Sequence, residues 1–219
     1  MSRCIWRKTY HVCGGIISSH TKAKYVDLQF ITDIPSRRII DSLYLFKFGW
    51  IMLLIFGGLP ASGKTSIYMC IASELGATYI RVDTIEQTLV DVGLNKIHSE
   101  GYELAYGIAA ENLSLGSTVV ADSVNPIEIT RKAWRSIGEK AKVTVLEIEI
   151  VCSDQIEHKQ RVETRVGDIE KLARVGWNDV LARDYEPWLR DHIVIDTAGS
   201  SLEDSIKMTR SLIDVRSSV

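Results

Sequence analysis

The sequence predicts an α/β fold built on a doubly wound parallel sheet of about five strands, with helices on both faces. Three observations predict it. From residue 52 to residue 215, short apolar runs alternate with helical patterns, and this alternation is typical of a parallel sheet. A glycine-rich loop joins the first apolar run directly to the first helical pattern. The chain of 219 residues, 46% of them hydrophobic and 25% charged, has the composition of one globular domain.

The glycine-rich loop carries the clearest functional signal. It reads G-x-x-x-x-G-K-T over Gly58, Leu59, Pro60, Ala61, Ser62, Gly63, Lys64 and Thr65. The apolar run 52–56 before it fits a buried strand, and the pattern 66–75 after it fits a helix that ends at Gly76. In such a strand–loop–helix unit, backbone N–H groups and the positive end of the helix bind phosphate oxygens.

The loop therefore predicts a P-loop fold that binds ATP together with Mg²⁺. Lys64 is expected to reach the β- and γ-phosphates, and the Thr65 hydroxyl is expected to ligate Mg²⁺. The predicted nucleotide-binding residues are Gly58, Leu59, Pro60, Ala61, Ser62, Gly63, Lys64, Thr65 and Ser66. The alternative is a glycine-rich turn with an exposed lysine, which the flanking strand and helix patterns disfavour.

The other elements follow from the same patterns. Further strands are expected at residues 78–83, 118–122, 142–151 and 192–196, where short apolar or alternating runs occur. Helices are expected at residues 84–92, 99–115, 127–141, 154–165, 178–189 and 202–215. Gly116 ends the second of these helices and Pro126 precedes the third. Residues 166–177 are polar and lack a clear period, which predicts an irregular segment.

The first fifty residues differ from the remainder because they show no clear hydrophobic period. We expect the domain to occupy residues 52–219 and residues 1–51 to be an extension that is poorly ordered or outside the core. An alternative is that part of Tyr25 to Phe48 adds a strand or helix to that core. The apolar stretch from Leu43 to Phe56 contains Lys47 and is about fourteen residues long, whereas a spanning helix needs roughly twenty. The sequence therefore predicts no transmembrane helix.

Charge and cysteine content narrow the expected partners. The net charge of −2 and the pI near 6.2 provide no basic surface for double-stranded nucleic acid. The four cysteines show no C-x-x-C pair and no zinc spacing, which favours reduced thiols and a cytoplasmic location. The expected partners are ATP and a small-molecule acceptor, with no membrane, for a chain that acts as a monomer or homodimer.

Two carboxylates lie where predicted strands end. Asp83 closes the second strand and Asp122 closes the third, at the sheet edge where α/β folds bind ligands. Asp122 follows apolar or small residues and is expected to orient Mg²⁺ through water; alternatively, it caps the turn that follows it. The alternative for Asp83 is to cap a helix beginning at Thr84, with Glu86 completing a capping box.

Taken together, these motifs resemble those of the small-substrate P-loop kinases. The resemblance extends from residue 52 to the C-terminus and rests on the glycine loop, Asp83, Asp122 and the paired arginines Arg161 and Arg165. Within this group the chain resembles the AAA-like "predicted kinase" ATP-binding proteins, which are related to chloramphenicol phosphotransferase, zeta toxin and gluconate kinase. No second helix-rich ATPase subdomain is recognisable, so a ring-forming ATPase is not expected.

The resemblance implies roles for residues outside the loop. Asp83 would accept the proton of the acceptor hydroxyl, with Glu86 as the backup. Arg161 and Arg165 lie four residues apart, hence on one helix face, and would belong to a short lid over the phosphates; alternatively, they lie on a solvated charged helix. The loop from Thr197 to Gly199 would lie beside the adenine. The implied catalytic residues are Lys64, Asp83, Arg161 and Arg165, and the expected metal-binding residues are Thr65 and Asp122.

Some conspicuous side chains receive no catalytic role from the sequence. The aromatic residues Trp177, Tyr185 and Trp188 follow the predicted lid, and such residues pack a core more often than they shape an acceptor pocket. Arg131 is expected at the surface. The histidines form no recognisable constellation, and none of them is assigned a role.

The sequence thus predicts an ATP-dependent kinase that transfers the γ-phosphate to a small hydroxyl-bearing acceptor. Two alternatives remain open at this point. One is a nucleotide-binding switch or adaptor ATPase with little turnover, and the other is a toxin-like kinase. The acceptor itself is not identified, because acceptor contacts come from loops that vary between such enzymes.

Overall fold

The computed structural model describes residues 51–165 and 175–217. The expectations for residues 1–50 and for most of the irregular segment 166–177 therefore lie outside the described chain. Among the described helices, none is long and apolar enough to cross a membrane.

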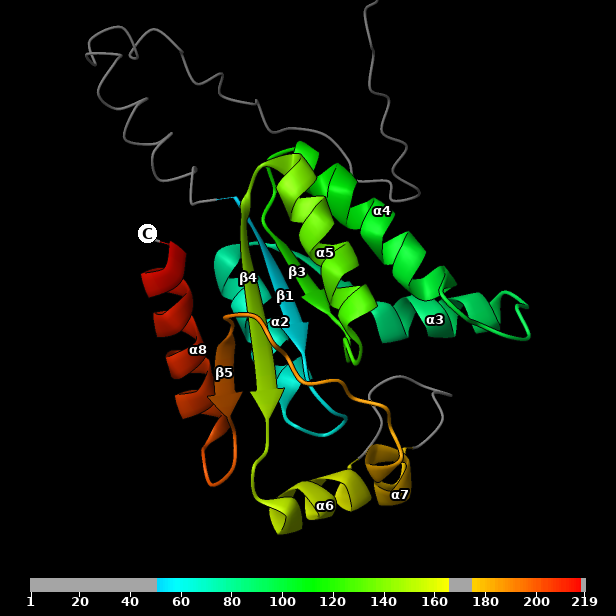
Figure 1. The fold of residues 1–219 in the computed structure, drawn as a ribbon, viewed down its shortest axis with the longest axis vertical. Helices are drawn as coiled ribbons and strands as arrows, with labels where there is room; N and C mark the ends of the chain where they lie inside the picture. The colour runs from blue at the N-terminus through cyan, green and yellow to red at the C-terminus, as the bar shows by residue number, and fades with distance from the viewer. Residues whose placement is uncertain (1–50, 166–174, 218–219) are drawn as a thin grey trace, which may run out of the picture. The chain divides into compact units, whose positions relative to one another are not determined.

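A five-stranded parallel sheet forms the centre of the domain (Figure 1). Its strand order is β2-β3-β1-β4-β5, so the chain steps to one side of β1 and then crosses to the other. The strands are β1 (Met52–Gly57), β2 (Thr78–Arg81), β3 (Val119–Asp122), β4 (Thr144–Val151) and β5 (Ile193–Asp196). Strand β1 is the middle strand of this order, and all six of its residues are buried. Burial is the environment that its apolar run predicts. The predicted fold class is confirmed.

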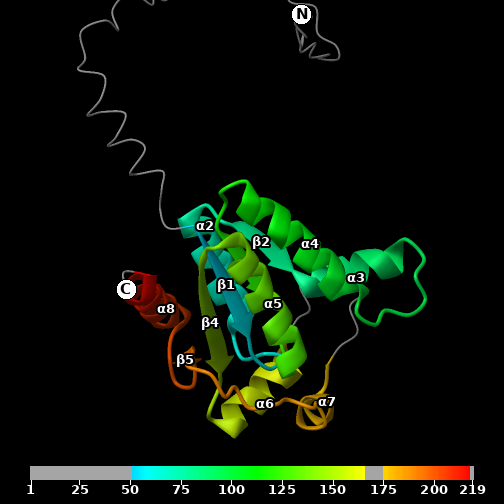
Figure 2. The ribbon, with the colours of Figure 1, turned by 45° about the horizontal axis from the view of Figure 1, so that its top comes forward.

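Helices cover both faces of the sheet (Figure 2). The helices are α2 (Lys64–Leu75), α3 (Val82–Asp91), α4 (Glu100–Ser114), α5 (Glu128–Ala141), α6 (Gln155–Thr164), α7 (Trp177–Leu181) and α8 (Leu202–Ser217). Alternate side chains of β1 enter different cores, as the twofold period of a strand requires. Leu54 and Phe56 pack with α2 and α8, whereas Leu53 and Ile55 pack with α4 and α5.

Two differences from the sequence-based elements bear on the site. Strand β2 ends at Arg81 rather than at residue 83, because helix α3 already begins at Val82. Helix α7 ends at Leu181 instead of continuing to residue 189. Residues 182–192, which we call the α7–β5 connection, have no regular secondary structure. They are held by side chains of neighbouring elements instead.

Candidate active site around the phosphate loop

The phosphate loop has a backbone that only glycine accommodates at its two ends. Gly58 has φ 143°, and a Cβ atom there would lie 2.3 Å from the Ile150 carbonyl oxygen. Gly63 has φ 93° and is the N-cap of α2, a conformation in which a side chain is strained. Ala61 also adopts a positive φ, 61°. The loop therefore turns sharply out of β1 and directs its backbone toward the start of α2.

Groups distant in sequence hold the loop in this shape. His158, which is buried, donates from Nε2 to the Pro60 carbonyl over 2.8 Å. The Thr197 hydroxyl lies 2.9 Å from the Ser62 carbonyl oxygen. The ring of Trp177 packs edge-on against His158, with centroids 5.4 Å apart. The sequence did not reveal the role of His158, because its partner is a backbone carbonyl 98 residues away.

Lys64 stands at the electrostatic centre of the site. It opens helix α2 and is only 5% exposed. Burial lowers the pKa of its ammonium group, the nearby carboxylates of Asp122 and Asp83 raise it, and the guanidinium groups of Arg165 and Arg81 lower it. Four residues from three separate segments thus act on one ammonium group, and two of the predicted catalytic residues, Asp83 and Arg165, are among them.

Asp122 ends β3 and is 2% exposed. Burial raises the pKa of its carboxyl group, while Lys64 and a hydrogen bond from Tyr79 lower it. The Tyr79 hydroxyl donates to Oδ2 over 2.6 Å, and Arg81 Nε lies 3.8 Å from the same oxygen. Oδ1 receives no hydrogen bond from any described residue. The alternative in which Asp122 caps the following turn finds no such bond in this part of the chain.

Asp83 is the second residue of α3 and lies two residues beyond the end of β2, whereas the sequence placed it at the end of the strand. The N-cap of that helix is Arg81, and no side chain caps it. The alternative in which Asp83 caps a helix starting at Thr84 is therefore wrong, because the chain is already helical at Val82. The Asp83 side chain is 33% exposed and lies 4.0 Å from Arg81 Nη2.

Glu86 lies one turn after Asp83 on the same helix. A Cβ atom added to Gly101 at the start of α4 would lie 2.3 Å from Glu86 Cγ, so the two helices meet closely at this glutamate. Burial and the neighbouring Asp83 raise the pKa of Glu86, and Arg183 lowers it. Burial also raises the pKa of the Tyr102 hydroxyl to about 12, with smaller contributions in the same direction from Glu86 and Asp83. Carboxylates thus gather on the α3 side of the loop.

A cavity of about 630 Å³ opens on the opposite side of the loop. Its lining comes from the phosphate loop, α2, α6 and the β5–α8 segment, and it includes Ala61, Gly63, Lys64, Thr65, Ser66 and Thr197. Its volume is in the range of small-molecule and cofactor sites. Seven of the predicted site residues therefore line one cavity: Ala61, Gly63, Lys64, Thr65, Ser66, Arg161 and Arg165.

Arg161 and Arg165 both line this cavity but are held differently. Arg161 donates from Nη1 to the Thr197 hydroxyl over 2.7 Å and from Nη2 to the Thr197 carbonyl over 2.9 Å. It also pairs with Glu157 at 2.5 Å. Arg165 follows the last residue of α6 and acts on the pKa of Lys64. Arg161 thereby ties the loop at Thr197 to α6, and the Thr197 hydroxyl ties it to the phosphate loop at Ser62, on the side where the adenine is expected.

Two polar groups fit a magnesium ion held chiefly by nucleotide and water. Thr65 lines the cavity one residue after Lys64, and the Asp122 carboxylate acts on the Lys64 ammonium group while Tyr79 donates to its Oδ2. Among the described residues there is no cluster of three or more His, Cys, Asp or Glu side chains that could hold a metal. A dedicated cluster of that kind is not needed, since Mg²⁺ commonly binds through one or two protein oxygens plus phosphates and water.

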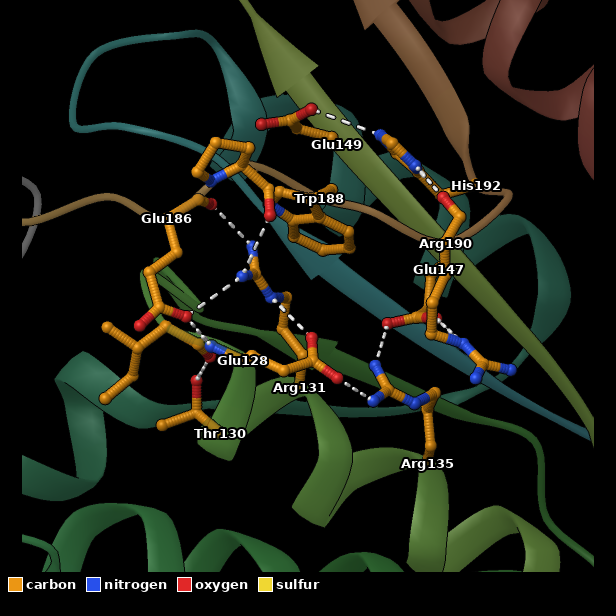
Figure 3. Close-up of polar contacts among 12 residues, drawn as sticks. Glu128, Thr130, Arg131, Arg135, Glu147, Glu149, Glu186, Trp188, Arg190 and His192 are labelled. Carbon is orange, nitrogen blue, oxygen red and sulfur yellow. Dashed lines mark hydrogen bonds and ion pairs between the residues drawn. The ribbon is translucent and has the colours of Figure 1, made fainter.

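Arg131 contradicts its expected surface position, since it is only 1% exposed. It rises from α5 toward the α7–β5 connection and donates to the Glu186 and Pro187 carbonyls over 2.9 and 3.4 Å (Figure 3). Its guanidinium carbon lies 4.9 Å from the centroid of the Trp188 ring. The sequence did not reveal this position, because its pattern predicts a helix over 178–189, whereas the chain leaves the helix after Leu181 and runs against α5 without regular secondary structure.

Comparisons with known proteins agree with this architecture. The AAA domain family matches residues 53–184, and no curated protein matches the chain in sequence. Kti12 of Chaetomium thermophilum in complex with ADP-AlF3 is 20% identical, with a TM-score of 0.57 over 75% of this chain and 98% of that one. The APS kinase CysC of Mycobacterium tuberculosis in complex with AMPPNP and APS is 16% identical, with a TM-score of 0.56 over 75% and 98%.

A gluconokinase of Sinorhizobium meliloti is similar at 14% identity, with a TM-score of 0.56 over 78% of this chain and 95% of that one. The TM-scores show that these three structures share the fold, and the chain spans nearly the whole length of each. The family match covers more than half of the chain. The chain therefore belongs to the AAA domain family, and its fold is that of the small-substrate P-loop kinases.

Proposed function

We propose that this protein is an ATP-dependent phosphotransferase that moves the γ-phosphate to a small hydroxyl-bearing acceptor. The observation that carries the proposal is the environment of Lys64. Its buried ammonium group borders a nucleotide-sized cavity on one side and faces the carboxylates of Asp122 and Asp83 on the other. A site of this kind can neutralise phosphate charge while keeping a base close to the transferred group.

The nucleotide would occupy the 630 Å³ cavity. Backbone N–H groups between Gly58 and Ser66 would bind its phosphates, and the Thr197 to Gly199 loop would lie beside its base. Lys64, Arg161 and Arg165 would oppose the negative charge of the transferring phosphoryl group. Thr65 and Asp122 would hold Mg²⁺, which supplies charge neutralisation between the β- and γ-phosphates.

The acceptor would approach from the α3 side. Its hydroxyl oxygen attacks the γ-phosphorus, the bond between that phosphorus and the bridging oxygen to the β-phosphate breaks, and ADP leaves. The hydroxyl proton passes to a carboxylate oxygen of Asp83. A carboxylate in the first turn of α3 is suited to this task because it remains one-third exposed and therefore accessible to an incoming molecule.

The domain is proposed to comprise residues 52–219 and to function in the cytoplasm, with residues 1–51 as an extension.

The decisive experiment measures ATP consumption by the purified full-length chain with Mg²⁺ and a broad panel of alcohols, including sugars, nucleosides, antibiotics and amino-sugar nucleotides. Acceptor-dependent release of ADP together with a phosphorylated product would support the proposal. If ATP binds but no alcohol in the panel stimulates its turnover, the result would favour the nucleotide-switch alternative over the kinase.

A further inference from the structure

The last residue of β1 has an unusual neighbour. A Cβ atom added to Gly57 would lie 2.4 Å from Cζ2 and 3.0 Å from Cη2 of Trp188. The edge of the indole ring therefore rests directly on the backbone at the point where the strand becomes the phosphate loop. Only glycine leaves room for such a contact. Trp188 belongs to the α7–β5 connection, which is 131 residues further along the chain.

Other groups hold the same junction from the remaining directions. The Tyr68 hydroxyl donates to the Gly57 carbonyl over 3.1 Å. Asn125 Nδ2 donates to the Phe56 carbonyl over 2.7 Å, and the Gly58 N–H donates to the Val124 carbonyl over 3.1 Å. Three hydrogen bonds thus fix the backbone of residues 56–58, and the Trp188 ring closes the side that they leave open.

The Trp188 ring is itself fixed at both its polar and its aromatic surfaces. Its Nε1 donates to the Tyr185 hydroxyl over 2.9 Å, and that hydroxyl donates to Glu149 Oε1 over 2.8 Å. The centroid of the His192 ring lies 5.2 Å from that of the Trp188 ring. His192 Nε2 in turn lies 3.2 Å from Glu149 Oε2. The guanidinium group of Arg131 faces the ring at 4.9 Å, within the range of a cation–π interaction.

Arg131 supplies the support that secondary structure does not. Its planar guanidinium group bonds two consecutive backbone carbonyls, those of Glu186 and Pro187, immediately before Trp188. It is also paired with Glu128 at 3.4 Å and Glu186 at 3.6 Å (Figure 3). A buried arginine costs desolvation energy, and these partners offset it. An apolar residue at position 131 would pack as well, so packing alone does not account for the charge and the planar fork of Arg131.

We propose that Arg131 and Trp188 are positioning residues for the phosphate loop. Arg131 fixes the α7–β5 connection, the connection fixes the Trp188 ring, and the ring fixes the backbone at Gly57. The loop N–H groups consequently keep the direction in which they would meet phosphates. The inference concerns loop geometry by itself, and only its effect on nucleotide affinity rests on the proposed function.

Arg135 provides a matched control. It lies one turn further along α5, is buried to a similar degree and pairs with the same Glu128. Its other partner is Glu147 in the middle of β4, at 2.8 Å. Glu147 also lies 3.8 Å from Arg190, at the end of the α7–β5 connection away from Gly57, whereas Arg131 bonds the carbonyls immediately before Trp188. Arg131→Lys and Arg135→Lys each keep the charge and lose the bidentate fork. The two substitutions therefore cost comparable stability and differ in what they leave unsupported.

The first readout is hydrogen exchange of the backbone amides of residues 58–65 in the full-length protein without nucleotide. We expect Arg131→Lys to speed their exchange at least about tenfold, equivalent to about 1.4 kcal/mol of local stability, and Arg135→Lys to leave it unchanged. Equal acceleration in both variants, or none in Arg131→Lys, would overturn the proposal. This readout needs no ligand, so it stands even if the chain proves not to be a kinase.

The second readout is the affinity for ADP, measured by calorimetric titration with Mg²⁺. A displaced loop is expected to bind about 10- to 100-fold more weakly in Arg131→Lys, whereas Arg135→Lys should remain within about twofold of the wild type. Failure of the wild-type protein to bind ADP would count against the proposed function rather than against this inference. An affinity for ADP that falls in step with the melting temperature in both variants would overturn the inference.

Trp188 tests the same idea if Arg131→Lys does not fold. Tyr185→Phe removes the hydroxyl that accepts from Trp188 Nε1 and leaves the whole indole ring at Gly57, so its amide exchange should stay near that of the wild type. Trp188→Leu withdraws the ring from the junction and should reproduce the tenfold acceleration. A Leu variant that behaves like the Phe variant would show that the ring does not position the loop.

Discussion

The two sides of the phosphate loop are built from opposite chemistry. On the α8 side, arginines and threonine hydroxyls line a cavity of about 630 Å³, and Arg161 ties the loop at Thr197 to α6. On the α3 side, Asp83, Glu86 and Asp122 gather close to one another. Positive charge suits a polyphosphate, whereas carboxylates suit proton transfer and metal orientation. Both sides act on Lys64, so the proposed nucleotide binding and the proposed phosphotransfer would meet at this residue.

Removing Lys64 should have the largest effect, because it acts on both sides. Lys64→Ala is expected to lower the rate of phosphotransfer by at least about 10³-fold and to weaken ATP binding as well. Product formation and calorimetric ATP binding check both properties. Circular dichroism controls for folding, because Lys64 is buried. Phosphotransfer at the wild-type rate would remove the loop from the mechanism.

Asp83 separates the two sides and also separates a kinase from a nucleotide switch. Asp83→Asn keeps the size of the side chain but cannot take the acceptor proton, so phosphotransfer should fall roughly 10²- to 10⁴-fold. ATP affinity should stay near the wild-type value, because Asp83 lies away from the nucleotide cavity. Stopped-flow binding and a product assay on one preparation provide the measurement. Normal transfer by this variant would withdraw the base role and turn attention to Glu86.

Arg161 should show the converse behaviour. Arg161→Ala removes two bonds to Thr197 and should raise the Kd for ATP about tenfold, as expected for lost charged hydrogen bonds. Its kcat at saturating ATP should change less than that of Arg165→Ala, since the guanidinium group of Arg165 helps to lower the pKa of Lys64, whereas that of Arg161 bonds to Glu157 and Thr197. Steady-state kinetics of the two variants side by side decide whether the pair divides its work in this way.

The titration of Glu86 is expected to make the stability of the folded protein depend slightly on pH. Burial and Asp83 raise its pKa above 4.5, so the folded protein holds this proton more tightly than the unfolded chain. The stabilisation is complete below the ordinary pKa and is lost as pH rises through the raised pKa. Glu86→Gln should therefore melt a few degrees higher than the wild type at neutral pH, and the gain should vanish near about pH 4. Melting curves at both pH values test this.

The domain boundary should have the smallest effect. A chain that begins at Met52 keeps all six residues of β1 and loses Ile51, whose side chain packs against the core beneath α4 and α5. We expect it to fold, to lose about 1 kcal/mol of stability and to bind ATP as the full-length chain does. Insolubility or loss of ATP binding would show that the preceding residues are structural.

Much of this comparison could be anticipated from sequence where a local pattern carried it. The glycine loop, the strand-end position of Asp122 and the alternation of strands and helices are all local signals, and the five-stranded sheet is confirmed. Asp83 proved to be helical rather than strand-terminal, because β2 is only four residues long. His158 and Arg131 bond to backbone carbonyls of segments that are distant in sequence and have no regular secondary structure. No local pattern encodes such partners, and only the folded chain brings them together.

The direction of β1 has a practical consequence for labelling and tethering. Parallel strands point the same way, so the amino end of β1 lies at the opposite edge of the sheet from the phosphate loop. Six residues of extended chain separate the two points by roughly 20 Å. A fluorophore attached at Ile51 would thus stand at a fixed separation from a fluorescent nucleotide held by the loop. Energy transfer between the two dyes would report occupancy without touching any group that contacts the ligand.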